Sequence, residues 1–172
     1  MGGWGSGYFR PHKMTIEACV SLDIAQCTRS KVLQPGVRLE GQGYVPHAET
    51  GEPVSEIHCV LDTTVSEAAA LRLCYWHPGP DDTLAEQVEY AIALTTSRQP
   101  YGGVRWWFYC PLGVDGKACS RRVRKLYLPP GARYFGCRHC YDLTYASRQT
   151  SQKAPRWLGA LLGQAASNTE LR

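Results

Sequence analysis

The 172-residue sequence has no apolar run long enough to cross a membrane, which takes about 20 residues. Its beginning lacks a basic start followed by an apolar stretch, which is the pattern of a secretory signal peptide. These two absences predict a cytoplasmic protein without a membrane partner. The thiols of a cytoplasmic protein are kept reduced, so disulfides are not expected.

Recognisable catalytic patterns are also missing. No serine or cysteine stands in a nucleophile elbow, and no His-x-Glu accompanies the cysteine pairs as in a zinc deaminase. Asp81 and Asp82 are neighbouring carboxylates, but they lie in a cluster of turn-forming residues. We therefore expect a protein that is not an enzyme.

Four of the eight cysteines follow one another in the order of a zinc ribbon: Cys110, Cys119, Cys137 and Cys140. The last two form a Cys-x2-Cys pair, and 17 residues separate Cys119 from Cys137, as in known ribbons. Four thiolates complete a tetrahedral Zn²⁺ shell and leave no position for water, so the pattern predicts a structural zinc site. Scattered free thiols or an iron centre are the alternatives.

The first cysteine pair is unusual because eight residues separate its members. This insert, residues 111–118, contains a proline, two glycines and an Asp-Gly step. Such residues favour turns, so we expect the insert to loop outward while Cys110 and Cys119 meet at the metal.

The remaining cysteines match no metal-binding spacing. They are Cys19, Cys27, Cys59 and Cys74, with His58 and His77 nearby in the sequence. A second metal site is conceivable, but reduced cysteines are commonly buried as small apolar residues, and we favour that interpretation.

Turn signals and apolar patterning predict an α+β fold. Ser21 can cap a helix with Asp23 in its first turn, and Gln34-Pro35-Gly36 would end it, so we expect a leading helix over residues 22–33. Polar clusters then separate five strand-like runs, which predict a small antiparallel sheet or sandwich: residues 37–44, 56–62, 69–76, 87–96 and 104–110. After Pro155, apolar residues at helical spacing predict a short amphipathic helix.

These elements suggest four parts. A flexible arm with glycines and aromatic residues covers residues 1–14, and a β-rich domain with the leading helix covers residues 15–104. The zinc ribbon covers residues 105–150, and the amphipathic helix and tail cover residues 151–172.

The charge is divided unevenly between the two ends. Residues 1–100 hold 7 Lys or Arg against 12 Asp or Glu, a net −5, whereas residues 101–172 hold 12 against 3, a net +9. A basic module of this kind suggests contact with a polyanion. The candidate phosphate-binding residues lie beside the cysteines or in the hairpin between them: Arg121, Arg122, Arg124, Lys125, Arg133, Arg138, His139 and Arg148.

Aromatic residues are interspersed with these cations: Trp106, Trp107, Tyr127, Tyr134 and Tyr145. Their rings can stack on unpaired bases, or they can fill the small core of the ribbon. For Trp107 and Tyr134 we favour the core.

Several stretches of the chain match those of one group of proteins: Gly2-Gly3-Trp4-Gly5-Ser6-Gly7, Ser21-Leu22-Asp23-Ile24, Cys119-Ser-Arg-Arg-Val-Arg-Lys-Leu-Tyr-Leu and Cys137-Arg-His-Cys-Tyr-Asp-Leu-Thr-Tyr-Ala-Ser-Arg-Gln. Together they resemble a family of small bacterial zinc-ribbon proteins of unestablished function, frequent in genomes that carry mobile elements. The first knuckle of that family reads Cys-Pro-x-Cys-Gly-Arg-Arg-Val. Here an insertion separates Cys110-Pro111 from Cys119-Ser120. The resemblance implies a zinc ribbon and carries no activity.

We therefore predict a non-catalytic zinc-ribbon protein that binds DNA or RNA through its basic C-terminal module, with Zn²⁺ as its cofactor. The alternative is a protein-interaction adaptor or inhibitor, such as one encoded on a mobile element, that acts on a host or defence complex.

Overall fold

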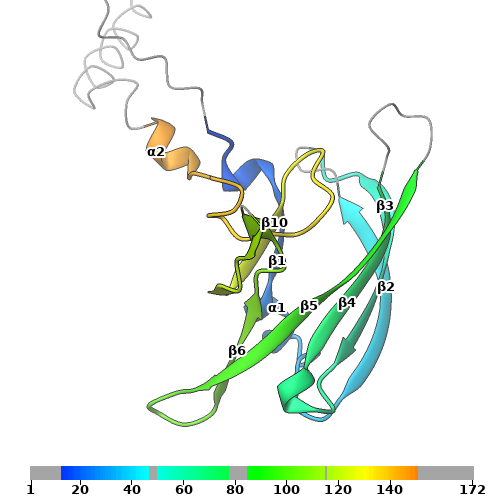
Figure 1. Ribbon diagram of the computed structural model, residues 1–172, viewed down its shortest axis with the longest axis vertical. Coiled ribbons are helices and arrows are strands. Elements are labelled where there is room, and N and C mark those ends of the chain that lie inside the picture. The colour runs from blue at the N-terminus through cyan, green and yellow to red at the C-terminus, as the bar shows by residue number, and fades with distance from the viewer. Residues whose placement is uncertain (1–12, 47–49, 78–84, 115, 151–172) are drawn as a thin grey trace, which may run out of the picture.

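A computed structural model describes residues 13–46, 50–77, 85–114 and 116–150 (Figure 1). The predicted C-terminal amphipathic helix and nearly all of the predicted N-terminal arm lie outside these residues. Within them, no helix is long and apolar enough to cross a membrane.

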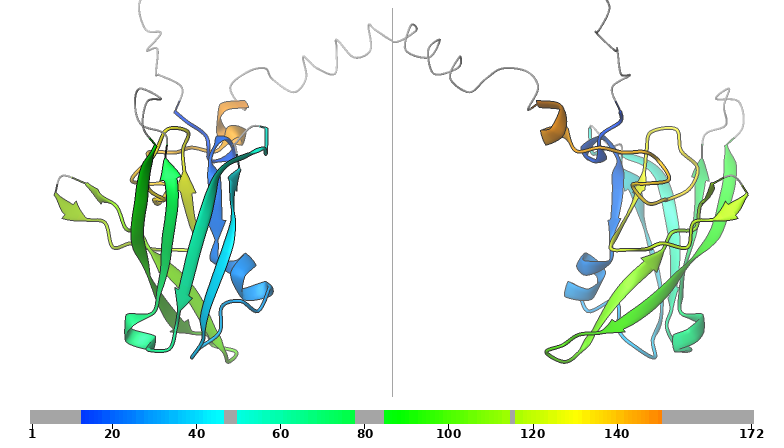
Figure 2. Two further views of the ribbon diagram at one scale, coloured as in Figure 1. Left: turned by 90° about the vertical axis from the view of Figure 1, so that its right-hand side faces the viewer. Right: turned by 60° about the vertical axis from the view of Figure 1, so that its left-hand side comes forward.

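A curved antiparallel sheet of six strands forms the body of the protein (Figures 1 and 2). Neighbouring strands follow in the order β2 (Arg38–Pro46), β3 (Pro53–Asp62), β4 (Ala70–His77), β5 (Glu86–Arg98), β6 (Val104–Tyr109) and β9 (Arg122–Val123). The first five correspond to the five strand-like runs of the sequence, which confirms those strands. The sixth, β9, pairs only through Phe108 with Val123 and Tyr109 with Arg122.

The smaller elements surround this sheet. β1 (Val20–Asp23) and β10 (Lys125–Leu128) form an antiparallel pair, and β7 (Gly113–Val114) pairs with β8 (Lys117–Ala118) in a hairpin. The described helices are short: η1 (Ile16–Ala18), α1 (Ile24–Arg29), η2 (Ser66–Ala68) and α2 (Ala146–Thr150).

The predicted α+β class and its leading helix are therefore wrong, because the described chain is mostly β. The first part of the expected helix is extended: Ser21 pairs with Tyr127 and Leu22 with Leu126. These pairings bury Leu22 against the core, which local helix propensity cannot match. The cap is Asp23 instead of Ser21, and α1 ends before Lys31, which has a left-handed φ of 57°.

Alternate residues of the strands face one side of the sheet, where they form the core. Cross-strand partners on this face are mostly apolar, for example Leu61 with Leu71 and Leu94 with Phe108. β1, β10 and α1 contribute Leu22, Leu126 and Ile24 to the same cluster. Cys110 and Cys137 belong to it as well, so one core spans the predicted boundary between residues 104 and 105.

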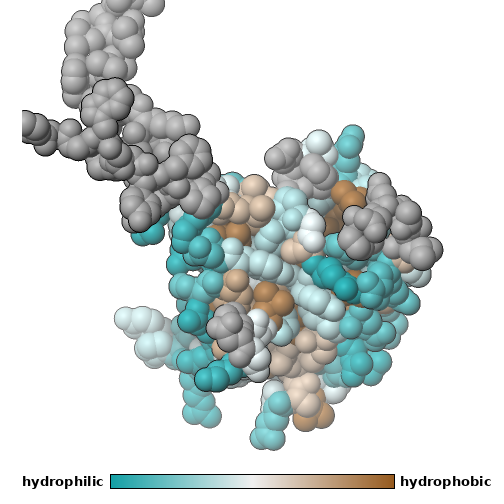
Figure 3. Space-filling view, turned by 45° about the horizontal axis from the view of Figure 1, so that its top comes forward, coloured by the Kyte–Doolittle hydropathy of each residue, from teal (hydrophilic) through white to brown (hydrophobic). Residues whose placement is uncertain are grey.

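The surface carries no such continuous apolar layer on the face shown in Figure 3. There the hydrophobic residues form separate small groups among hydrophilic ones. Isolated exposed apolar residues of this kind are normal for a folded protein.

Asp23 joins α1 to the basic C-terminal part. One carboxylate oxygen accepts the N–H of Ala25 at 2.9 Å, which caps the helix. Arg124 donates to both oxygens at 3.1 Å, and Lys125 lies 3.5 Å away. Burial would raise the pKa of Asp23, but the hydrogen bonds and the two cations hold this pKa below its ordinary value.

Replacing Asp23 should therefore have a pH-dependent effect. Asp23→Ala should lower the free energy of unfolding at neutral pH by about 1 kcal/mol through the lost cap alone. Because the native pKa of Asp23 is depressed, its contribution is complete above its unfolded-state pKa of about 4 and disappears as the pH falls through the native pKa. Urea unfolding measures the difference in free energy of unfolding between wild type and Asp23→Ala. This difference should be smaller near pH 3 than at neutral pH.

Asp23→Asn provides the matched control, because an amide oxygen can still cap α1 but carries no charge. This variant should lose less stability than Asp23→Ala at neutral pH. If Asp23→Ala lowered the free energy of unfolding equally at both pH values, the stabilising role of the charged Asp23 carboxylate would be contradicted.

Candidate metal centre and basic groove

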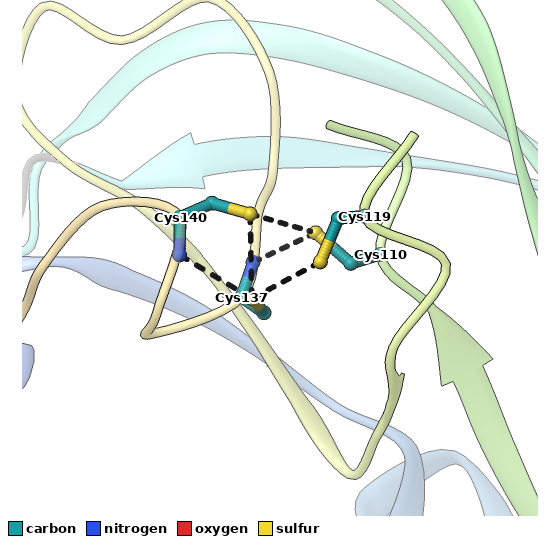
Figure 4. A group of neighbouring side chains, drawn as sticks. All are labelled: Cys110, Cys119, Cys137 and Cys140. Atoms are coloured by element: carbon teal, nitrogen blue, oxygen red, sulfur yellow. Dashed lines mark hydrogen bonds between the residues drawn. The ribbon is translucent and has the colours of Figure 1, made fainter. Parts of the chain in front are cut away.

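The four predicted metal ligands come together at one point of the structure (Figure 4). Cys110 follows β6, Cys119 follows the β7–β8 hairpin, and Cys137 and Cys140 lie in a turn after β10. All four Sγ atoms lie within 4.8 Å of one another. Closer Sγ–Sγ separations are 3.8 Å between Cys110 and Cys140, 3.9 Å between Cys119 and Cys137, and 3.6 Å between Cys137 and Cys140.

This geometry fits a tetrahedral zinc ion. A Zn–S bond of about 2.3 Å places the sulfurs of a regular tetrahedron about 3.8 Å apart, close to the separations observed. Backbone N–H groups point at the sulfurs: that of Cys137 lies 3.2 Å from the Cys110 sulfur, and that of Cys140 lies 3.4 Å from the Cys137 sulfur. Such hydrogen bonds favour thiolates over thiols, so the cluster is consistent with a zinc-binding site.

Burial disfavours the thiolate form at two of the four cysteines, Cys110 and Cys140. It raises the pKa of Cys110 to about 11, and it also raises the pKa of Cys140, together with hydrogen bonds among the thiols. At Cys119 the N–H of Arg121 and neighbouring thiols lower the pKa despite partial burial. A bound metal ion supplies the positive charge that holds all four groups deprotonated.

The insert between the first two ligands forms a hairpin, as expected from its turn-forming residues. Gly113 pairs with Ala118, and Gly116 adopts a left-handed φ of 75° at the turn. Two backbone bonds close its base: Cys110 donates to the carbonyl of Arg121 at 2.9 Å, and Cys119 donates to that of Leu112 at 2.8 Å. The eight inserted residues therefore return Cys119 to the side of Cys110.

Tyrosines of the main sheet and of the turn hold the chain just before Cys137. The hydroxyl of Tyr90 accepts the N–H of Phe135 at 2.9 Å, and that of Tyr75 donates to the carbonyl of Arg133. Tyr141 donates in the same way to the carbonyl of Tyr134. Sequence reasoning missed these roles, although a tyrosine at an inward position of a strand signals a buried hydroxyl that needs a partner.

The other four cysteines do not join the cluster. Cys19 is buried beside Tyr127 and Leu143, while Cys27 and Cys59 pack against the main core. Cys74 accepts a hydrogen bond from Gln87 at 3.1 Å. Among the described residues, no second group of three or more such ligands is close enough to hold a metal ion.

A basic groove lies beside the metal cluster. Its volume is about 500 Å³, and its polar lining comes mainly from Arg122, Arg124, Lys125, Arg138 and His139. A second hollow of about 550 Å³ continues from it, shares Arg138, His139 and Tyr145, and adds Lys13, Asp142 and Arg148. We call these two hollows together the basic groove.

The eight candidate phosphate-binding residues lie in different places in the structure. Six of them line the basic groove: Arg122, Arg124, Lys125, Arg138, His139 and Arg148. Arg121 is exposed but does not line it, and Arg133 forms an ion pair with Glu86 at 2.6 Å.

The aromatic candidates divide in a similar way. Trp106 and Tyr127 are buried, with 5% and 7% of their surface exposed. The ring of Tyr134 packs edge-on against that of Tyr90, with centroids 5.1 Å apart. Tyr134 is nevertheless 38% exposed, and Trp107 is half-buried, so neither is simply a core residue. Trp107, Tyr127 and the 39% exposed Tyr145 line the basic groove.

No protein-family model, curated protein or solved structure matches the chain. The comparisons thus add no support to the resemblance with bacterial zinc-ribbon proteins. The four-cysteine cluster is the part of that resemblance that the structure bears out.

Removing one ligand should remove the metal. We expect one zinc ion per chain, with Cys140→Ser losing it and Cys59→Ser and Cys74→Ser retaining it. Because Cys110 and Cys137 belong to the main core, metal loss should destabilise the whole protein by about 4 kcal/mol or more. Elemental analysis and thermal unfolding of the three variants test this, and zinc loss in Cys59→Ser or Cys74→Ser would show that the ligands are wrongly chosen.

Gly136, next to the ligand Cys137, has no space for a side chain. A Cβ atom there would collide with Leu112 of the insert and come within 2.7 Å of the ring of Tyr141. Gly136→Ala should therefore push the insert away from the turn and lower the free energy of unfolding by about 1–3 kcal/mol. A matched Gly43→Ala change meets Ile57 at an ordinary 3.9 Å, and equal effects of the two changes in denaturant unfolding would refute the argument.

Proposed function

We propose that the protein is a non-catalytic, zinc-stabilised protein that binds nucleic acid through the basic groove. The observation that supports this most directly is the gathering of cations at the groove, next to the four-cysteine cluster. Phosphate backbones attract such groups strongly, and arginine in particular matches phosphate with two parallel hydrogen bonds.

The charge balance of the groove supports a polyanionic ligand. Its first hollow holds four cations, and within the described part of the chain they form ion pairs with one carboxylate, Asp23, so the formal net charge is +3. The second hollow adds Lys13, Arg148 and Asp142, which brings the sum over the whole groove to +4. Asp23 engages Arg124 and Lys125, which makes Arg122 and Arg138 the stronger candidates for phosphate contact.

The metal and the groove are expected to act together. Arg138 and His139 lie between the ligands Cys137 and Cys140, and Arg122 follows Cys119 by three residues. Zinc binding would fix the turn from Cys137 to Cys140 and the segment that follows Cys119. The basic side chains on these segments would then lose less conformational entropy when they bind nucleic acid. We therefore expect nucleic-acid affinity to fall when the metal is removed.

A salt series tests the proposed function. The full chain should bind fluorescently labelled oligonucleotides, and the logarithm of its affinity should fall linearly with the logarithm of salt concentration. The double variant Arg122→Ala with Arg138→Ala should bind more weakly, with a salt slope smaller by about 2, since each lost phosphate contact removes about one unit. Fluorescence anisotropy measures both quantities.

A matched control removes the same charge elsewhere. Arg72 and Arg98 are exposed on the main sheet and do not line the groove, so their double alanine variant should keep the wild-type slope. Absence of binding by zinc-loaded wild type would refute the proposal. In that case, a partner captured from nuclease-treated lysate would favour the adaptor alternative instead.

A further inference from the structure

We infer that the ligand of the basic groove is a single strand of nucleic acid, whose bases stack on Tyr145 and Trp107. This inference rests on the proposed function and specifies its ligand. It follows from the residues that line the groove, from the elements near it and from the surroundings of the two aromatic rings.

The described elements are poorly suited to reading a duplex. Sequence-specific duplex binding usually places an α-helix or a two-stranded ribbon in the major groove. The longest described helix, α1, has six residues, and the strands of the β7–β8 hairpin have two residues each. Only one cation, Lys117, belongs to the described residues of that hairpin. The cations gather at the basic groove instead, together with two accessible aromatic rings.

Trp107 is held ready for stacking. Its indole N–H donates to Ser97 Oγ at 2.8 Å, which fixes the orientation of the ring. The guanidinium of Arg105 lies over the ring, 4.3 Å from its centroid, although Arg105 does not line the groove. Cation–π attraction keeps the guanidinium on one face of the ring, and a base can stack on the other face.

Tyr145 repeats this arrangement at the junction of the two hollows. It is 39% exposed, and the guanidinium of Arg138 lies 5.1 Å from the centroid of its ring. Both hollows are lined by Tyr145 and Arg138. A base stacked on Tyr145 would thus place its own phosphate near Arg138, with room on both sides for the neighbouring nucleotides.

Binding to an oligothymidylate of about 16 nucleotides and to a duplex of the same length tests the inference. The zinc-loaded wild-type chain should prefer the single strand. Tyr145→Ala should weaken single-strand binding by about 5- to 150-fold, the range typical for loss of a stacking ring, and Tyr145→Phe should retain it. Tyr44→Ala is the matched control, because Tyr44 is 67% exposed on the edge strand β2, away from the groove.

Photocrosslinking provides a readout that does not depend on affinity. An oligonucleotide with 5-iodouracil should crosslink to Tyr145 or Trp107, as identified by mass spectrometry of the digested protein. Crosslinks confined to residues outside the groove would overturn the inference.

The outcomes separate the two proposals. If the duplex binds as tightly as the single strand and Tyr145→Ala changes neither affinity, the single-strand inference is wrong and the proposed function stands. If zinc-loaded protein binds neither oligonucleotide, the proposed function itself is wrong. Preference for the single strand, lost in Tyr145→Ala and kept in Tyr145→Phe, supports both.

Discussion

The meeting of four sulfur atoms is the constraint on which the C-terminal half of this structure depends. Around three of the four cysteines there is little regular structure: β8 and β9 on either side of Cys119 have two residues each, and the turn from Cys137 to Cys140 has none. Hydrogen bonds to neighbouring loops and tyrosines position these segments, but four like-charged thiolates at one point would push them apart. A metal ion bound by the four sulfurs would turn this repulsion into attraction and would fix three separate parts of the chain at one point.

The cluster is also part of the core, and this distinguishes it from a ribbon attached by a linker. Cys137 is fully buried, and Cys110 follows directly on β6 of the main sheet. Tyr75 and Tyr90, from β4 and β5, bind the backbone of the loop that leads to Cys137. The sheet and the metal cluster therefore stabilise each other, and the positions of the basic residues near the cysteines depend on both.

The sequence was most informative where the signal is local. Turn-forming clusters between apolar runs located the five long strands, and cysteine order identified the ligand cluster despite the unusual insert. The helix expected over residues 22–33 was wrong because its first residues pair with Leu126 and Tyr127, about 100 positions away. No local pattern contains that partner.

The same limitation applies to the charged residues. Arg124 and Arg133 look equivalent in the sequence, yet Arg124 contacts Asp23 while Arg133 contacts Glu86. Both acidic partners lie far away along the chain, so only the tertiary structure distinguishes the two arginines. Two aromatic residues of neighbouring strands also differ in a way that the sequence does not reveal. Tyr90 accepts a hydrogen bond from the loop before Cys137, whereas Trp107 lines the basic groove.

The pairing of β1 with β10 has a consequence for synthesis in the cell. Val20 pairs with Leu128, so β1 emerges from the ribosome more than 100 residues before its partner strand exists. At about 5–20 residues per second, the unpaired edge of β1 waits for several seconds while the main sheet can already assemble. Leu22 and its neighbours need protection from aggregation during that interval. During synthesis this long loop can close only after residues 125–128 have emerged, and the four-cysteine cluster can form only after Cys137 and Cys140 have followed.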